Sequence, residues 1–254
     1  MPTIDLNSDL GEGFGPWTMG DDAAMLALVT SANIACGGHA SDPETMFATL
    51  TLARDQGVVI GAHPGYADPM GFGRRIIPTS VGEVERLVAA QIGALMGVAA
   101  LAGAKLRYVK AHGALANLAA DDRSVADAVA RAIAAVSRDL AVLAISETHQ
   151  VAAAQTLGLQ TYAEIFADRA YLPNGRLVPR NRPDAMIVDH NAAADRLLGF
   201  LDSGLMPVVQ GPPIRLDAQS ICVHGDSPGA VALARHLRAS LSAAGITIAP
   251  FLGP

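Results

Sequence analysis

The chain has 254 residues, of which 51% are hydrophobic and 17% charged, and its formal net charge is −6. This length is enough to bury one substantial core, and the acidic balance argues against a nucleic-acid-binding surface, which needs clustered lysine and arginine. Only Lys105 and Lys110 are lysines, so arginine carries almost all of the positive charge.

The sequence shows neither a basic-then-apolar leader segment nor an uninterrupted membrane span. The longest apolar-rich stretch, 87–104, is interrupted by Gln91 and by three glycines, which favours a buried helix. The two cysteines, Cys36 and Cys222, give no disulfide framework, and we expect them to be core thiols. We therefore expect a cytoplasmic protein that binds neither nucleic acid nor membranes.

Short apolar runs alternate with capped helical segments along the chain. In chain order, the runs expected to form strands are 3–7, 31–36, 58–63, 106–112, 140–146, 159–166 and 220–225, with 185–189 and 207–210 as weaker candidates. Three of the intervening helices carry clear start and stop signals. These signals are Asp42, Pro43 and Gly57; Ser80, Glu83 and Gly103; and Ser227, Pro228 and Gly245.

This alternation predicts a parallel sheet with crossover helices. No glycine-rich dinucleotide fingerprint follows the first strand, and polar residues follow nearly every strand instead of one switch point. We therefore expect a parallel β/α barrel of seven or eight strands, forming a single domain over residues 1–254. The segment 167–184 is expected to be irregular.

The polar residues that follow the strands form the candidate site, because the carboxyl ends of all barrel strands meet at one mouth. They are Asp5, Asn7, Asp9 and Glu12; Asn33 and His39; His63; Lys110 and His112; Glu164, Asp168 and Arg169; and His224 and Asp226. His190 follows a weak strand, whereas His149 and His236 lie on expected helices. A single histidine after a strand is usually structural, but several at equivalent positions favour a shared function.

Two interpretations stay open for the basic residues. Lys110 lies in an apolar strand, where burying its charge is unfavourable. It has either a functional role or a structural one, in a buried ion pair with Asp5 or Glu164. Arg74 and Arg75 follow a Gly-Phe-Gly hinge and form either an anion-binding site or a solvated surface pair.

The segment 167–184 is either a mobile lid over an anionic substrate or a solvated loop. It carries Arg169, Arg176, Arg180 and Arg182.

The sequence alone assigns no metal site. Aspartate and histidine at strand ends suit a divalent ion, and His39 and His63 are the candidate ligands if one is bound. Asp5 and Asp9 fit helix capping or loop hydrogen bonding equally well. No HxxxH or HxH pair fixes a site by its spacing.

Six motifs in order make the chain resemble the LamB/YcsF family from about residue 3 to residue 251. They are "DLNSDLGEGFG", "NIACGGHASDP", "GAHPGY" followed by "GFGRR", "KAHGALAN", "EIFADRAY" with "GRLVPR", and "CVHGD". The chain departs from the family pattern "KPHGALYN" at Ala111 and Ala116, and also at Gly38 and Ser41. These departures bear on the shape of the pocket more than on its ionisable groups.

The resemblance implies a seven-stranded barrel related to the polysaccharide-deacetylase-like group. It also implies the A component of an enzyme that, with subunits B and C, opens 5-oxo-L-proline to L-glutamate at the expense of ATP. An amide is unreactive at neutral pH, so phosphorylation of its oxygen and general acid–base groups would be needed. No Gx4GK[ST] loop is present, which suggests a nucleotide site at an interface with the partners or in an unfamiliar pocket, with Mg²⁺ accompanying ATP.

On this basis the strand-end residues receive expected roles. The catalytic candidates are Asp9, His39, His63, Lys110, His112, His224 and Asp226, with Asp9 or Asp226 orienting an imidazole. The candidates for substrate or phosphate binding are Asn7, Glu12, Arg74, Arg75, Asp168 and Arg169. The alternatives are a metal-dependent hydrolase or deacetylase that needs no ATP, and a non-catalytic subunit that binds substrate for a partner enzyme.

Overall fold

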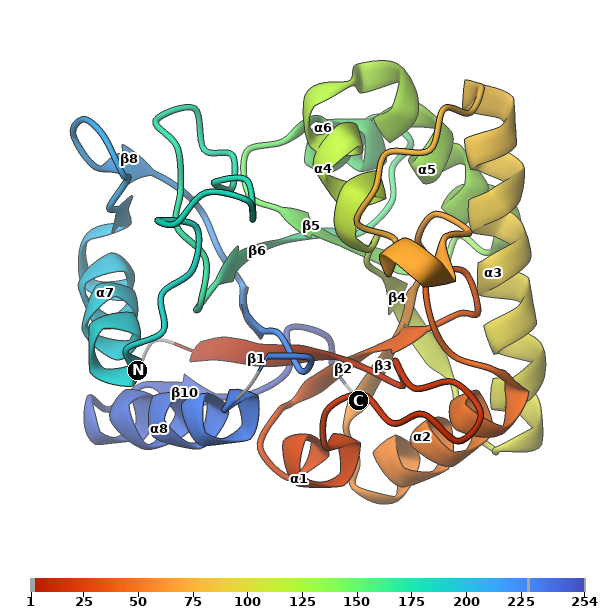
Figure 1. Ribbon diagram of the computed structural model, residues 1–254, viewed down its shortest axis with the longest axis horizontal. Coiled ribbons are helices and arrows are strands. Elements are labelled where there is room, and N and C mark those ends of the chain that lie inside the picture. The colour runs from red at the N-terminus through yellow and green to blue at the C-terminus, as the bar shows by residue number, and fades with distance from the viewer. Residues whose placement is uncertain (1–2, 228, 254) are drawn as a thin grey trace.

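The computed structural model describes residues 3–227 and 229–253 and shows a closed parallel barrel (Figure 1). The barrel strands are β1 (Thr3–Leu10), β2 (Ser31–Ala35), β3 (Val59–His63), β4 (Leu106–Val109), β5 (Ala141–Ile145), β6 (Thr161–Phe166) and β9 (Ser220–Val223). Each strand pairs in parallel with the next, and β1 also pairs with β9, which closes a ring of seven strands. The prediction of a seven-stranded β/α barrel is confirmed.

Helices surround the ring of strands (Figure 1). They are α1 (Asp22–Leu26), α2 (Pro43–Asp55), the short 3-10 helix η1 (Pro69–Gly71), α3 (Val81–Leu101), α4 (Gly113–Asp121), α5 (Arg123–Val136), α6 (His149–Thr156), α7 (His190–Ser203) and α8 (Ala230–Ala243). The Asp42 carboxylate accepts hydrogen bonds at the start of α2, and Ser80 with Glu83 forms a capping box on α3, as predicted.

Several predicted element boundaries are wrong. Residues 185–189 form only an isolated bridge between Met186 and Arg169, because Asp189 caps α7 instead of ending a strand. Residues 207–210 form no strand. The two-residue strand β7 (Leu205–Met206) precedes them and pairs antiparallel with β8 (Ile214–Arg215).

Smaller differences occur at other ends. The fourth strand stops at Val109, so Lys110 and His112 follow it, although the chain remains bonded to the β3 segment through the Lys110 amide. Helix α8 begins after Gly229, so Ser227 is not its N-cap, and the expected Pro228 signal lies outside the described residues. Gly245 has a φ of +76° and ends α8 as predicted.

The interior of the barrel is more polar than the apolar runs of the sequence suggest. Asp5 accepts hydrogen bonds from Ser31 and Ser220 on the two neighbouring strands. Above it, the Asn7 side chain reaches across to Glu164 of β6. The ring of strands therefore encloses a hydrogen-bonded polar column instead of the branched aliphatic layers usual in eight-stranded barrels.

The opposite end of the barrel is closed by aromatic side chains. Strand β10 (Thr247–Ile248) pairs with β1, and Phe251 beyond it packs its ring 5.0 Å from the Tyr108 ring. Tyr108 crosses the interior, and its hydroxyl donates to the Asn33 side chain at 2.6 Å. A Cβ on Gly61 would lie 2.3 Å from the Tyr108 ring, so glycine is required there. The barrel therefore opens at the carboxyl ends of the strands.

Among the described residues, α3 has the length and hydropathy that a membrane span also has. It packs against α5 and α2 on the outside of the barrel, and buries one side through Val84, Val88, Ile92 and Leu95. The sequence predicts a buried helix, and α3 is buried along this one side only. Cys36 and Cys222 are free, buried thiols on either side of β1, also as predicted.

Candidate active site

The carboxyl ends of the strands surround a cavity of about 470 Å³. Of the residues predicted from the sequence, those that line it are Asp9, His63, Arg74, Lys110, His112, Arg169 and His224. They come from every barrel strand except β2 and β5, or from the loop that follows the strand. The predicted convergence at one mouth is therefore present.

Lys110 occupies the centre of the site. Its ammonium group donates to Asp9 Oδ1 at 3.0 Å, lies 3.0 Å from Glu164 Oε2, and contacts Cys222 Sγ at 3.1 Å. Burial alone would lower the pKa of Lys110, but the neighbouring carboxylates, Asp9 foremost, raise it well above its usual value. Of the two ion-pair partners that the sequence suggests for Lys110, Glu164 is present at 3.0 Å. The other, Asp5, accepts hydrogen bonds only from hydroxyl groups.

The charge on Asp9 is stabilised by the same contacts. Burial raises the pKa of Asp9, but His63 and Lys110 outweigh it and hold the pKa well below its usual value. Glu164 differs, since burial raises its pKa despite the contact with Lys110. Lys110 and Asp9 therefore form a fixed pair of opposite charges at the floor of the cavity.

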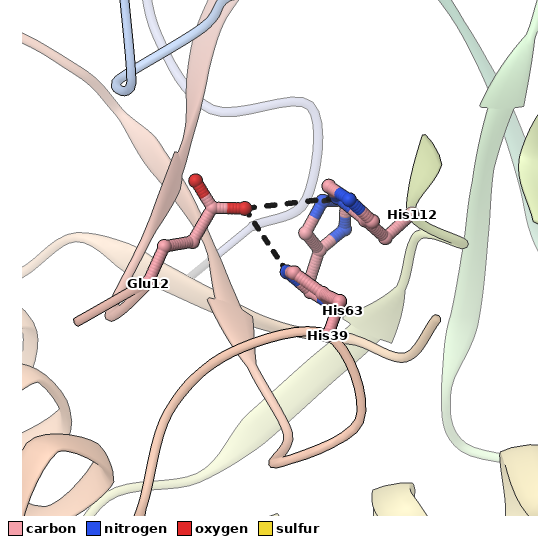
Figure 2. Close-up of side chains that lie close together, drawn as sticks. All are labelled: Glu12, His39, His63 and His112. Carbon is pink, nitrogen blue, oxygen red and sulfur yellow. Dashed lines mark hydrogen bonds and ion pairs between the residues drawn. The ribbon is translucent and has the colours of Figure 1, made fainter. Parts of the chain in front are cut away.

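Three imidazoles and one carboxyl group form a cluster beside this pair (Figure 2). The rings of His39 and His112 are stacked 3.6 Å apart, and His63 meets His112 edge to face. Glu12 Oε1 lies 3.0 Å from His39 Nε2 and 3.6 Å from His112 Nδ1. Glu12 therefore faces imidazoles, whereas the sequence led us to expect it at a substrate or phosphate.

The protonation of this imidazole cluster is set by burial. Burial, followed by the neighbouring imidazoles, lowers the pKa of His112 well below its usual value, and burial likewise lowers the pKa of His39. Burial and the Asp9 charge raise the pKa of Glu12 to about 8. The imidazoles of His39 and His112 are therefore neutral at neutral pH.

Glycines bring the "GFGRR" loop close to this cluster. Gly73 has a φ of +60°, and a Cβ on it would lie 2.7 Å from His39 Cβ and 2.8 Å from His112 Cδ2. The preceding residue, Phe72, accepts a hydrogen bond from His112 Nε2 at 2.8 Å. The glycine hinge therefore serves the close approach of the loop to the histidines.

His224 and Asp168 form a separate pair. His224 Nδ1 lies 2.9 Å from both carboxylate oxygens of Asp168, and the ring of Phe166 stacks on the imidazole. Burial raises the pKa of Asp168, but His224 outweighs it and the pKa is lowered. A carboxylate that accepts from Nδ1–H leaves Nε2 as the free basic nitrogen, the arrangement of a general base.

Three arginines meet at the wall of the cavity. They are Arg74, Arg169 and Arg180, whereas Arg176, which also lines the cavity, is bonded to Asp121 and to two backbone carbonyls. Burial and the charge of Arg180 lower the pKa of Arg169 to about 10, and burial and Arg74 lower the pKa of Arg180. Arg169 is buried, and its Nε has no hydrogen-bond partner among the described residues. Clustered, incompletely bonded guanidinium groups form a site for an anion.

The structure separates some predicted residues from the cavity. Asp226 pairs with Arg74 at 2.6 Å instead of orienting an imidazole. Arg75 points to solvent, with a side chain 62% exposed, and pairs with Asp68. Asn7 is fully buried beneath Lys110, to whose ammonium it offers Oδ1 at 3.3 Å.

The remaining histidines lie elsewhere. His149 and His236 are on helices, as predicted. His190 is the first residue of α7, and its ring centroid lies 6.2 Å from that of His236.

The sequence predicts no substrate-binding or catalytic role for three charged residues that line the cavity. Glu164 belongs to the strand-end candidates but is expected only as an ion-pair partner of Lys110. Arg176 and Arg180 are expected only as members of the irregular segment 167–184. No periodicity in that segment distinguishes Arg180 from Arg182, which pairs with Asp184 outside the cavity.

A closed parallel barrel with a buried imidazole, carboxylate and lysine centre at its mouth defines an enzyme-like β/α-barrel protein. The particular family follows from comparison with known proteins. The model of the LamB/YcsF family matches residues 4–253, and the chain belongs to this family.

Relatives and a solved structure agree with this assignment. The chain is 51% identical over 251 residues to the 5-oxoprolinase A subunit of Rhodopseudomonas palustris, covering 98% of this chain and 99% of the relative. It is 50% identical over 248 residues to the protein of the same name from Chloroflexus aggregans, with 98% of each covered. The crystal structure of the lactam utilization protein from Thermus thermophilus is 38% identical, with a TM-score of 0.92 over 99% of this chain and 100% of that one.

Proposed function

We propose that this chain is the A component of an ATP-dependent 5-oxoprolinase, which opens 5-oxo-L-proline to L-glutamate in the cytoplasm. The observation that carries the proposal is that the His224–Asp168 pair and three arginines open into the same cavity. A lactam needs a base for water, and its phosphorylated form needs cations. The names of the relatives, which are a 5-oxoprolinase component and a lactam utilization protein, support the substrate class.

His224 is the proposed general base. Its Nδ1 is held by Asp168, so Nε2 takes a proton from the attacking water, and Asp168 stabilises the resulting imidazolium. The same imidazolium then returns the proton to the ring nitrogen as the C–N bond breaks. This would leave the acyl phosphate of glutamate, from which a second water releases phosphate and glutamate. His63 and His112 also line the cavity, but their remaining nitrogens, His63 Nε2 and His112 Nδ1, face each other at 3.0 Å, which leaves His224 as the better base.

The arginine cluster fits the phosphates of ATP. When bound, ATP would supply a phosphoryl group that activates the amide oxygen. Arg74, Arg169 and Arg180 would hold the anionic groups, and Arg169 Nε, with no partner among the described residues, is an available donor. Mg²⁺ would enter with the phosphates. The carboxylate of 5-oxoproline is a second anion for the same cluster.

The Lys110–Asp9 pair is proposed to act as a positioning element. The Lys110 ammonium contacts four side chains, of which Asp9, Asn7 and Cys222 are hydrogen-bond partners and Glu164 is an ion-pair partner. These contacts leave Lys110 poorly placed to reach a phosphate, the role expected from the sequence. It instead fixes the floor against which the lactam would rest.

Partner subunits, which we take to be subunits B and C, complete the enzyme. The sequence contains no phosphate-binding loop for the nucleotide, so part of the ATP site is assigned to the partners. We therefore expect the isolated chain to release little glutamate from 5-oxoproline and ATP.

The experiment is glutamate release from 5-oxoproline plus ATP, with this chain added to or omitted from purified partner subunits. The proposal predicts release only when all components are present. Undiminished release without this chain would contradict the proposal. Rapid release by this chain alone would contradict the assigned division of labour.

A further inference from the structure

The contact between His63 and His112 has an unusual distribution of protons. His63 Nδ1 lies 2.8 Å from the carbonyl oxygen of Lys110, and His112 Nε2 lies 2.8 Å from that of Phe72. A carbonyl oxygen only accepts, so both of these nitrogens carry hydrogen. A neutral imidazole has one N–H, so the other nitrogen of each ring presents a lone pair.

These two lone pairs face each other. His63 Nε2 and His112 Nδ1 are 3.0 Å apart, and neither has a hydrogen to donate in the neutral form. Two facing lone pairs at this distance repel unless a cation lies between them, either a proton carried by one ring or a metal ion bound by both. The Asp9 carboxylate also favours a cation at this place, because its Oδ1 is 3.4 Å from His63 Nε2. Glu12 Oε1 is 3.6 Å from His112 Nδ1 and would become a carboxylate ligand on losing its proton to a bound cation.

The spacing of these atoms matches that of ligands around one metal ion. Ligands 2.0–2.1 Å from a zinc-like ion, at angles between octahedral and tetrahedral, are roughly 2.9–3.4 Å apart. The ligand atoms of Glu12, His39, His63 and His112 all lie within 4.8 Å of one another. Small side-chain movements would therefore bring three of them onto one ion.

The surroundings are those of a metal site. Metal-binding histidines usually donate their second N–H to a backbone carbonyl or carboxylate, as His63 and His112 do. His39 Nε2 lies 3.0 Å from Glu12 Oε1 and is placed to orient that carboxylate (Figure 2). Asp9 Oδ1 already accepts from Lys110 and Asn33, so Glu12 is the more available oxygen ligand.

We propose that His63 Nε2, His112 Nδ1 and the Glu12 carboxylate bind one divalent transition-metal ion of the zinc class. Two imidazole nitrogens and one carboxylate suit Zn²⁺, Co²⁺ or Ni²⁺, whereas Mg²⁺ prefers oxygen ligands alone. His63 and His112 line the cavity, so a remaining coordination position faces the place of the substrate. This site does not depend on the proposed reaction or on ATP.

The test is metal binding by the full chain after removal of metals with a chelator. Co²⁺ is titrated with visible absorption as the readout, and Zn²⁺ by calorimetry. We expect one equivalent to bind, with d–d bands typical of a nitrogen and oxygen environment. His63→Gln and His112→Gln should each weaken binding roughly 100-fold or more, because loss of an outer-shell partner alone costs 10–100-fold.

Controls keep the test independent of folding and activity. His149→Gln changes a histidine on α6 outside the site and should bind like the parent. Circular dichroism checks that the metal-free variants are folded, and Glu12→Gln provides a nearly isosteric ligand change. X-ray absorption of the parent should show two imidazoles. The absence of saturable binding by the parent, which would leave a shared proton between the rings, or undiminished binding by both histidine variants, would overturn the proposal.

Discussion

The two walls of the cavity are built in different ways. The histidine, aspartate and lysine wall stands on barrel strands, and its members hold one another, as Lys110 does with Asp9 and Glu164. The arginine wall belongs largely to the irregular segment 167–184, where Arg180 has a long contact to the Met186 sulfur, at 3.6 Å. The charged groups of the first wall are paired with one another, whereas Arg169 Nε in the second wall has no hydrogen-bond partner among the described residues.

This difference indicates a division of tasks. Groups fixed by several internal hydrogen bonds are pre-organised for proton transfer, and they lose little conformational freedom when substrate binds. Groups with few partners gain most from a ligand. Arg176, in contrast, is anchored to Asp121 and to two backbone carbonyls, and it ties the segment to α4. Substitutions in the two walls should therefore have different effects.

The largest effect is expected from the base. His224→Gln should lower kcat of the reconstituted enzyme by about 10²- to 10⁴-fold, the usual contribution of a general base, with little change in KM. His236→Gln, on α8, is the matched control. Equal kcat values for the parent and His224→Gln would contradict the assignment of His224 as the general base.

A loss of stability is expected at the centre of the same wall. Lys110→Met leaves Asp9 and Glu164 buried without their cation, which should lower the free energy of unfolding by about 3–5 kcal/mol. Urea unfolding measures it, and Lys105→Met at an exposed position is the control. A decrease no larger than that of the control would show that the ion pairs are dispensable.

The pH dependence of stability reports on the floor of the barrel. Burial raises the pKa of Asp5 to about 6, so its protonated form is favoured in the folded state. Asp5 therefore contributes about 3 kcal/mol to the free energy of unfolding at a pH below its unfolded pKa of about 3.9, and this contribution is lost as the pH rises through 6.

The Asp5→Asn variant isolates this contribution. Its free energy of unfolding should lack the decrease between pH 4 and pH 7 that the parent shows, whereas Asp139→Asn, at an exposed site, should keep it. Chemical unfolding at each pH measures the difference. Parallel curves for the parent and Asp5→Asn would be inconsistent with a raised pKa.

The smallest of these effects is expected in the arginine wall. Arg180→Gln removes one charged hydrogen bond to the bound anion, worth about 1.5–3 kcal/mol, and should raise KM about 10- to 100-fold with kcat nearly kept. Arg75→Gln, whose side chain is 62% exposed and outside the cavity, should change neither constant. A loss confined to kcat would instead assign Arg180 to the chemical step.

The sequence predicts this fold well because the alternation of strands and helices is a local signal. It also predicts which histidines meet, because strand ends converge in any parallel barrel. It does not predict the partners: Asp168, and not Asp226, orients an imidazole. Nor does it separate Arg74 from Arg75, since adjacent side chains diverge according to tertiary contacts. The carbonyls that fix the protons of His63 and His112 depend on the folded backbone and leave no mark in the sequence.

Direct binding of 5-oxo-L-proline to the full chain, measured by calorimetry with and without ATP, is the most immediate test of where the substrate lies. We expect one molecule to bind per chain, with an affinity that Arg180→Gln lowers and Arg75→Gln leaves unchanged. Binding by the partner subunits in the absence of this chain, together with no heat from this chain, would contradict a substrate site at the mouth of the barrel.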